Sequence, residues 1–200
     1  MRAMTLTATC GLTAALMIPM LAGGAGAADV PLVLTSARVT VEGTSNVHEW
    51  TASTTAVLIT EVDIAAGEGD LLQAALQPGA LRAFDLTIPA RGLTSPKEGI
   101  DKNMHKALKV EEHPHITFRL RAFEPAGANY QATGMLTIAG VEREVVLNLE
   151  VQPKAGAIVV TGTTGLVMTD YGIKPPSAML GMVKAGPKVT IRLELTMAAS

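Results

Sequence analysis

The sequence predicts an all-β fold: an antiparallel eight-stranded β-barrel with one or two short α-helices. Three segments alternate apolar and polar residues with a period of two, which is typical of strands with one buried face and one face in water. Five further segments show the same pattern more weakly, and one segment has a helical period instead. Eight strands with so few helices favour a sheet closed on itself, with a helix across a mouth or edge.

The three clearest strands each place aliphatic side chains on one face and mostly polar ones on the other. They cover residues 115–122, 145–151 and 189–197, and the weaker strands cover residues 32–41, 54–64, 81–88, 130–138 and 158–168. The predicted inward side chains of the three are Ile116, Phe118, Leu120 and Ala122; Val145, Leu147, Leu149 and Val151; and Val189, Ile191, Leu193, Leu195 and Met197. The interior of the barrel should therefore be aliphatic.

Local signals predict one hairpin turn and two helices. Residues 138–143 should form a tight hairpin, because Gly140 can adopt the positive φ that such turns require. Residues 99–110 have an apolar residue at every fourth position, which predicts a short amphipathic helix. Its apolar stripe consists of Ile100, Met104 and Leu108. A second short helix is expected at residues 70–76, before a Pro-Gly pair.

The first 28 residues have the features of a secretory signal peptide. A positive charge at Arg2 precedes an apolar stretch, and small residues up to Ala28 provide a cleavage site. The only cysteine, Cys10, lies inside this segment, so the mature chain should have no disulfide or thiol chemistry. We expect export to the periplasm, cleavage after Ala27 or Ala28, and a single domain over residues 29–200, with no transmembrane segment in the mature chain.

Charge and composition narrow the class of partner. The signal peptide holds one of the 16 basic residues and none of the 18 acidic ones, which leaves 15 against 18 and a net charge of −3. This balance, without a basic block, argues against nucleic acid as a partner and against electrostatic adsorption to a membrane. Hydrophobic residues make up 48% of the chain and aromatic ones only 3%, so aliphatic side chains must line or fill the interior. Aliphatic walls suit a flexible lipid chain as well as a packed core.

Motifs for catalysis and metal binding are scarce. The sequence has no Gly-x-Ser-x-Gly turn, no phosphate-binding loop and no His-Glu-x-x-His spacing. The histidines, which we interpret as strand-end or rim residues, are His48, His105, His113 and His115. Asp170, Tyr171 and Gly172 are interpreted as a turn at the end of a strand. We therefore predict no enzymatic activity, no bound metal and no cofactor other than a bound isoprenoid lipid.

The mature chain resembles the YceI-like family over essentially its whole length, with the similar segments in the same order. These segments are residues 43–50 (GTSNVHEW), 99–109 (GIDKNMHKALK) with 113–118 (HPHITF), 134–141 (GMLTIAGV), and 168–173 (MTDYGI) with Pro175, Pro176 and the strand 189–195. The resemblance implies an extended lipocalin-like barrel, export to the periplasm and, as in members with a known ligand, a polyisoprenoid chain in the tunnel.

The predicted function is that of an exported, non-enzymatic protein that holds an isoprenoid, quinone-like or other long-chain lipid in an apolar interior. The residues expected to line the lipid are Trp50, Phe84, Met104, Phe118, Leu120, Leu136, Leu147, Met168 and Tyr171. The alternative is a barrel packed solid by its own side chains, which acts as a structural or interaction module of the cell envelope. An outer-membrane barrel is disfavoured because it would need aromatic girdles. The sequence is consistent with a homodimer as well as with a monomer.

Overall fold

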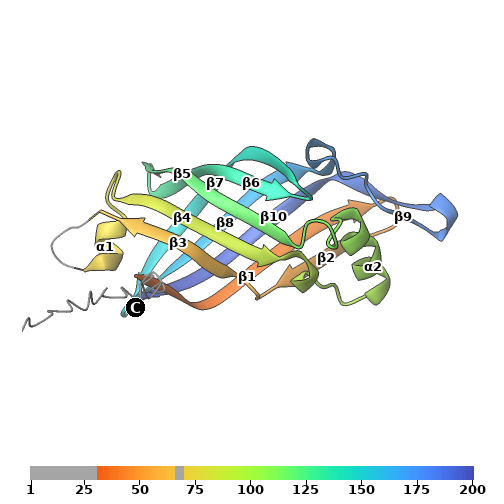
Figure 1. The fold of residues 1–200 in the computed structure, drawn as a ribbon. Helices are drawn as coiled ribbons and strands as arrows, with labels where there is room; N and C mark the ends of the chain where they lie inside the picture. The colour runs from red at the N-terminus through yellow and green to blue at the C-terminus, as the bar shows by residue number, and fades with distance from the viewer. Residues whose placement is uncertain (1–30, 66–69) are drawn as a thin grey trace, which may run out of the picture.

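The computed structural model describes residues 31–65 and 70–200, and these hold ten strands and two α-helices (Figure 1). The predicted signal peptide, residues 1–28, lies outside the described residues. The strands are β1 (Leu32–Ser45), β2 (Glu49–Thr54), β3 (Leu58–Ile64), β4 (Leu81–Pro89), β5 (His115–Ala126), β6 (Asn129–Ile138), β7 (Val141–Lys154), β8 (Ala157–Val167), β9 (Ser177–Ala178) and β10 (Val183–Ala199). The helices are α1 (Leu71–Ala75) and α2 (Glu98–Ala107), with short 3-10 turns at Ala90–Gly92, Met168–Tyr171 and Met179–Gly181.

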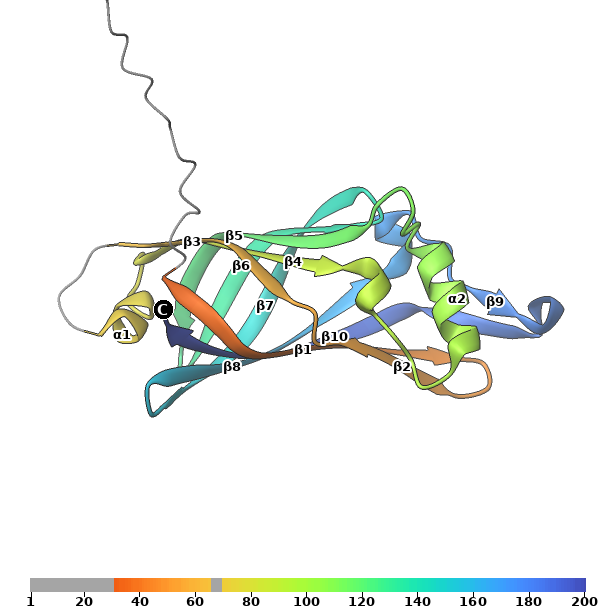
Figure 2. The ribbon, with the colours of Figure 1, turned by 60° about the horizontal axis from the view of Figure 1, so that its bottom comes forward.

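The strands form one strongly curled, antiparallel sheet. Nine of them follow the order β2-β1-β10-β8-β7-β6-β5-β4-β3, and β9 pairs with β10 at one end. The sheet curls strongly along its length, which Figure 2 shows from another side. Within the described residues, no hydrogen-bonded ladder joins the edge strands β2 and β3. The all-β, antiparallel class is therefore confirmed, and the architecture is a curled sheet, or half-barrel.

The predicted number of eight strands is wrong, because the sequence reasoning missed the short strands β2 and β9, and the strand expected at residues 54–64 begins only at Leu58. The chain turns between β2 and β3, where the backbone N–H of Ala56 donates to the Thr54 hydroxyl at 3.1 Å. The backbone N–H of Val57 then donates to the carbonyl of Thr55 at 3.0 Å. Thr54 is the only buried polar residue among those described, and this hydrogen bond satisfies it. β2 folds back on β1, and β9 adds two residues beside β10.

The predicted inward and outward faces are confirmed for β7 and β10, and for the part of β5 that precedes a β-bulge. In β7 the side chains of Val145 and Leu149 are buried while Val146 and Asn148 are exposed. In β5 the register with β6 shifts between Leu120 and Ala122, which inserts one extra residue. A bulge of this kind reverses the phase of the strand beyond it. The inward assignment of Ala122 is therefore wrong, and Phe123, 9% exposed, takes the inward position instead.

The hairpin between β6 and β7 turns at Ala139 and Gly140, as predicted. Both residues have positive φ, 50° and 79°, which is the geometry of a two-residue type I′ turn. A Cβ added at Gly140 would lie 2.5 Å from the His113 ring. Glycine is therefore required here twice, for its backbone conformation and for the space that the imidazole occupies.

The two helices lie at opposite ends of the sheet (Figures 1 and 2). At α1, Asp70 is the N-cap, and its Oδ1 accepts a hydrogen bond from the backbone N–H of Leu72 at 2.8 Å. The side chain of Leu72 is buried in the hydrophobic core at this end. Helix α2 lies over the other end and confirms the helix expected from the four-residue period. Among the described residues, neither helix has the length and apolarity needed to cross a bilayer.

Candidate functional site

Two adjoining cavities occupy the interior of the curled sheet. The first has a volume of about 240 Å³ and lies beneath α2, and we call it the α2-end cavity. The second has a volume of about 140 Å³ and extends toward α1, and we call it the α1-end cavity. They share the wall residues Val39, Ile88, Ile116, Leu136 and Ile191. Because these five side chains belong to both walls, the two cavities adjoin along the interior of the sheet, and we call the pair of them the tunnel.

Helix α2 forms one wall of the α2-end cavity. The side chains of Ile100, Met104 and Leu108 all line it. Residues four apart lie on the same face of a helix, so the apolar stripe predicted from the sequence faces the tunnel. The fixed position of α2 depends on His105, whose Nε2 lies 2.8 Å from the carbonyl oxygen of Leu93. Asp101 adds a second tie, since its Oδ1 accepts from the backbone N–H of Ser95 at 2.6 Å.

Trp50, on β2, contributes the largest side chain to the α2-end cavity. Its Nε1 donates a hydrogen bond to the carbonyl oxygen of Thr44 at 3.2 Å. The ring occupies space that a side chain at Gly43, the residue paired with it on β1, would otherwise fill. With the N–H satisfied by the backbone, the apolar body of the indole is free to face the cavity.

The few polar side chains of the tunnel wall gather at the α2 end. They are Ser45, His48, Asn103 and Ser177, from the β1–β2 turn, helix α2 and strand β9. In the α1-end cavity, the only polar residue on the wall among those described is Thr164. We call the α2-proximal end of the tunnel its mouth. The polar residues contribute little of the wall surface, so both cavities present an almost wholly apolar surface, which suits the long apolar tail of a lipid.

Tyr171 lies buried beside the α2-end cavity, 3% exposed. Within the described part of the chain its hydroxyl has no hydrogen-bond partner. Burial raises the pKa of the Tyr171 hydroxyl to about 12, with Arg143 opposing and Asp170 adding to the shift. The phenol therefore stays protonated at neutral pH. The turn predicted around Asp170 is confirmed, and Gly172 ends it with φ 66°.

The structure places all nine predicted lining residues on the tunnel wall. Trp50, Met104, Met168 and Tyr171 line the α2-end cavity, Phe84, Phe118, Leu120 and Leu147 line the α1-end cavity, and Leu136 lines both. Contact with a ligand stays a prediction for each of them. The sequence reasoning missed Phe123, which the β5 bulge turns inward, and it missed Ile173 and Pro176 after the turn that follows β8. No periodic pattern covers the last two, so no local signal could have identified them.

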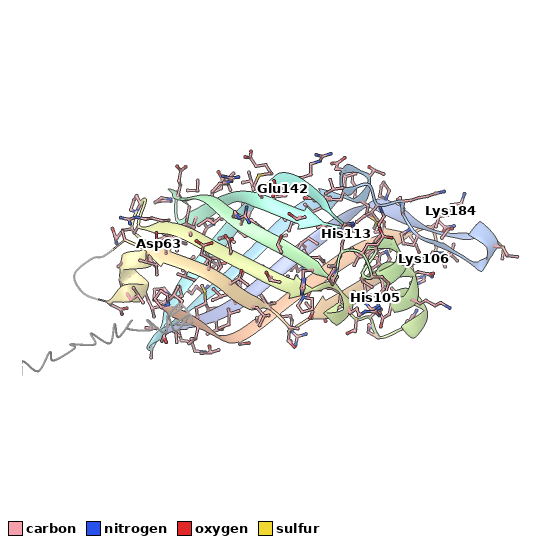
Figure 3. All side chains as sticks on the ribbon, viewed as in Figure 1. Asp63, His105, Lys106, His113, Glu142 and Lys184 are labelled. Atoms are coloured by element: carbon pink, nitrogen blue, oxygen red, sulfur yellow. The ribbon has the colours of Figure 1, made fainter. Side chains whose placement is uncertain are left out.

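The four histidines lie at separate places. His105 contacts the Leu93 carbonyl, His113 packs against Gly140, His48 lies at the mouth, and His115 begins β5 opposite Pro89. Within residues 31–65 and 70–200, no group of three or more His, Cys, Asp or Glu side chains is arranged to hold a metal ion. The contacts of His105 and His113 assign these two to the framework of the α2 end; Figure 3 shows both rings.

Comparison with known proteins relates the sequence to one family and the fold to several solved structures. The YceI-like domain family matches residues 32–197. The fold is similar to that of BcnA from Burkholderia cenocepacia, with a TM-score of 0.62 at 15% identity over 80% of this chain and 95% of that one. It is also similar to a polyisoprenoid binding domain from Saccharophagus degradans implicated in plant cell wall breakdown, with a TM-score of 0.61 at 12% identity over 86% of this chain and 99% of that one. A Campylobacter jejuni YceI protein gives a TM-score of 0.53 at 16% identity over 72% and 84%. No curated protein matches the sequence significantly.

Proposed function

The chain belongs to the YceI-like family, and from that premise we propose that it is a non-enzymatic binding protein that holds an isoprenoid or another long-chain lipid. The observation that carries this proposal is the apolar tunnel, which runs through both cavities and is not filled by its own side chains. The ligand would lie inside the curled sheet, in the manner of a lipocalin-like barrel. The polyisoprenoid-binding structural relative supports the choice of ligand class.

The length of the tunnel favours a long, thin ligand. The tunnel wall includes residues of β10 from Val183, at the mouth, to Met197, near α1. At about 3.3 Å per residue this distance is roughly 46 Å along the strand. A strand tilt of about 40° reduces it to roughly 35 Å along the sheet axis. A compact ligand would leave most of this length empty, whereas an extended chain of several isoprene units would follow it.

The free volume inside the curled sheet also distinguishes a lipid-binding protein from a barrel packed solid by its own side chains. A protein interior normally fills its space to the density of an organic crystal, and voids larger than a water molecule are few. The two cavities, of about 240 and 140 Å³, are far above that size and are partly open at the surface. Empty apolar cavities destabilise a fold because their walls lose contacts. A bound hydrocarbon chain would restore those contacts, so the interior favours an occupant.

The wall offers binding groups and no reacting centre. Its side chains are aliphatic and aromatic apart from Thr164 and the four polar ones near the mouth, and the buried Tyr171 hydroxyl stays protonated. A neutral phenol can donate a hydrogen bond to a polar head group without taking part in chemistry.

The proposal includes export to the periplasm, which is supported by the signal-like pattern of residues 1–28.

Trp50 provides the test, because it is the only tryptophan of the chain and lies on the wall of the α2-end cavity. Protein stripped of lipid should be titrated with geranylgeraniol while the tryptophan emission is recorded. The expected result is a saturable spectral change that reaches its limit at one ligand per chain. Leu120→Glu, which places a charge on the wall of the α1-end cavity, should weaken this titration by at least about tenfold, since burying an unpaired carboxylate costs several kcal/mol.

The matched control is Arg121→Glu, whose side chain is exposed on the bulge of the same strand. It should titrate like the parent protein. Identical titrations of parent and Leu120→Glu, with circular dichroism showing both folded, would contradict binding inside the tunnel.

A further inference from the structure

Exposed apolar side chains gather at the α2 end of the molecule. Val47, in the β1–β2 turn, is 65% exposed, Met182 is 67% exposed and Leu180 is fully exposed. Asn46 ties the two loops together, since its Nδ2 donates to the Met182 carbonyl at 2.8 Å and its Oδ1 accepts from the Lys184 backbone N–H at 2.8 Å. Val47, Leu180 and Met182 have the three most exposed large apolar side chains among the described residues. We call Val47, Leu180 and Met182 the apolar tip.

The backbone at Leu180 shows that this exposure does not serve the fold. Its φ and ψ are 56° and 30°, in the left-handed region that glycine, asparagine and aspartate occupy at the least cost. The leucine side chain gains no burial in return, because it is fully exposed. A residue with an unfavourable backbone and no packing contributes nothing to stability by being apolar. Its apolar character therefore indicates a partner outside the chain.

The charge around the apolar tip indicates what kind of partner fits. The segment 172–193 contains four basic residues and no aspartate or glutamate, although the whole chain has a net charge of −2. Lys174 and Lys184, on this segment, are exposed, and so is Lys106 on the neighbouring helix α2. Figure 3 shows Lys184 on the projecting β9–β10 end and Lys106 on α2. Of the nearby charges, Arg192 pairs with Glu42 at 3.0 Å and Glu49 is exposed two residues from Val47, so the positive charge of this end rests on the exposed lysines. Exposed apolar side chains with exposed lysines near them are the combination that binds a lipid surface with anionic head groups.

The apolar tip also lies next to the mouth of the tunnel. Val47 precedes His48, and Met182 precedes Val183, and both following residues are part of the wall of the α2-end cavity. A surface that held the tip would therefore face the mouth. We propose that the apolar tip and its lysines dock the protein on an anionic lipid bilayer, with the mouth of the tunnel toward the membrane. Docking is independent of the ligand, whereas its use for loading or releasing a lipid rests on the proposed function.

Sedimentation with lipid vesicles tests the docking. Purified protein is mixed with vesicles of equal parts phosphatidylglycerol and phosphatidylcholine, or of phosphatidylcholine alone, and the bound fraction is measured. The parent protein should bind the anionic vesicles more strongly. The double variant Leu180→Asp with Met182→Asp should bind them at least about tenfold more weakly, because charged side chains do not enter the apolar part of the interface. Aspartate tolerates the left-handed backbone at position 180, so the loop should keep its shape.

The matched control is Leu58→Asp with Val146→Asp. These two side chains are also exposed, 56% and 42%, but they lie on β3 and β7, away from the tip. This variant should bind vesicles like the parent protein. All variants share the same N-terminal segment, so a difference between them arises from the substituted positions. Lys174→Glu with Lys184→Glu should remove the preference for anionic vesicles.

Three results would overturn the proposal: no vesicle binding by the parent protein, equal loss of binding in the tip and control variants, or a parent dimer that the tip variant converts to a monomer in sedimentation equilibrium. The last result would assign the tip to self-association. Mass spectrometry of bound lipid is a separate measurement, so vesicle binding by a protein that carries no lipid would support docking while removing lipid carriage.

Discussion

A bulky residue at position 136 should block the tunnel at its middle. Leu136 is on β6 and belongs to the wall of both cavities. In Leu136→Trp the indole would occupy the passage between the α2-end cavity and the α1-end cavity. A ligand entering at the mouth could then fill only the first of them. The variant should therefore bind short prenols normally and gain nothing from further chain length.

The expected difference in binding affinity follows from the length of the prenol chain that the indole at position 136 excludes. An isoprene unit has five carbons, and at about 0.8 kcal/mol for each buried methylene its burial contributes roughly 4 kcal/mol before ordering costs. If ordering cancels about half, each unit strengthens binding by about 2 kcal/mol, or roughly 30-fold in Kd. The parent protein should show this gain at each step from geraniol to farnesol to geranylgeraniol. In Leu136→Trp the gain should stop once the chain reaches the indole.

Isothermal titration calorimetry with the three prenols measures this dependence on chain length. The matched control is Met135→Trp, which adds the same ring at the neighbouring position, on the opposite face of β6, and outside both cavity walls. It should follow the parent protein. The same pair also tests the packed-barrel alternative. A filled core would be overpacked by the indole at a cost of about 1–3 kcal/mol, lowering Tm by several degrees, whereas an open tunnel accepts it. Equal chain-length dependence in all three proteins would refute the placement of the ligand.

Three further predictions concern the framework. Leu147→Asp should lower the free energy of unfolding by several kcal/mol while Asn148→Asp changes it little, because only the first buries an unpaired charge; equal shifts of Tm would mean that the faces of β7 are misassigned. Gly140→Ala should destabilise the β6–β7 hairpin by more than about 1 kcal/mol, and His113→Ala should relieve the part of this loss that comes from the clash between the added methyl group and the imidazole. A double-mutant cycle measured by denaturant unfolding that shows no coupling between the two positions would contradict the contact between His113 and Gly140. Because the pKa of Tyr171 is raised in the folded protein, its contribution to the free energy of unfolding is fully present below pH 10 and should be lost as the pH rises from 10 to about 12. In Tyr171→Phe the Tm should therefore fall less steeply over this pH range than in the parent protein. An equally steep fall of Tm in both proteins would contradict the burial of the Tyr171 hydroxyl.

Alternation in the sequence predicted most of the strands because an inner and an outer face impose different chemistry on successive residues. It could not predict the bulge in β5. Ala122 and Phe123 are both apolar, so the sequence is consistent with either phase, and only the pairing with β6 shows that the register shifts beyond Leu120. It also failed at β2, where Glu49–Thr54 is held by its hairpin with β1 and not by an apolar face of its own.

The candidate site was predicted where side-chain size or helical period marked it. Trp50 was chosen as a large apolar residue, and Met104 was chosen from the stripe of α2, and both line the α2-end cavity. Asn103 could not be placed at the mouth from the sequence, because it joins His48 on the wall of the α2-end cavity only when the β1–β2 turn and α2 meet at one end of the sheet. The exposure of Leu180 was equally hidden, since a leucine in a sequence gives no sign of a left-handed backbone.

The most direct test of lipid carriage is the mass spectrum of an organic extract of the protein. The chain should be expressed in a bacterium with residues 1–28 included, purified without detergent, and extracted with solvent against an internal standard. Lipid binding inside the tunnel predicts a long-chain lipid, an isoprenoid or a comparable molecule, close to one per chain in the parent protein and strongly reduced in Leu120→Glu. A parent protein that is folded and yields no extractable lipid, from native or recombinant cells, would contradict carriage.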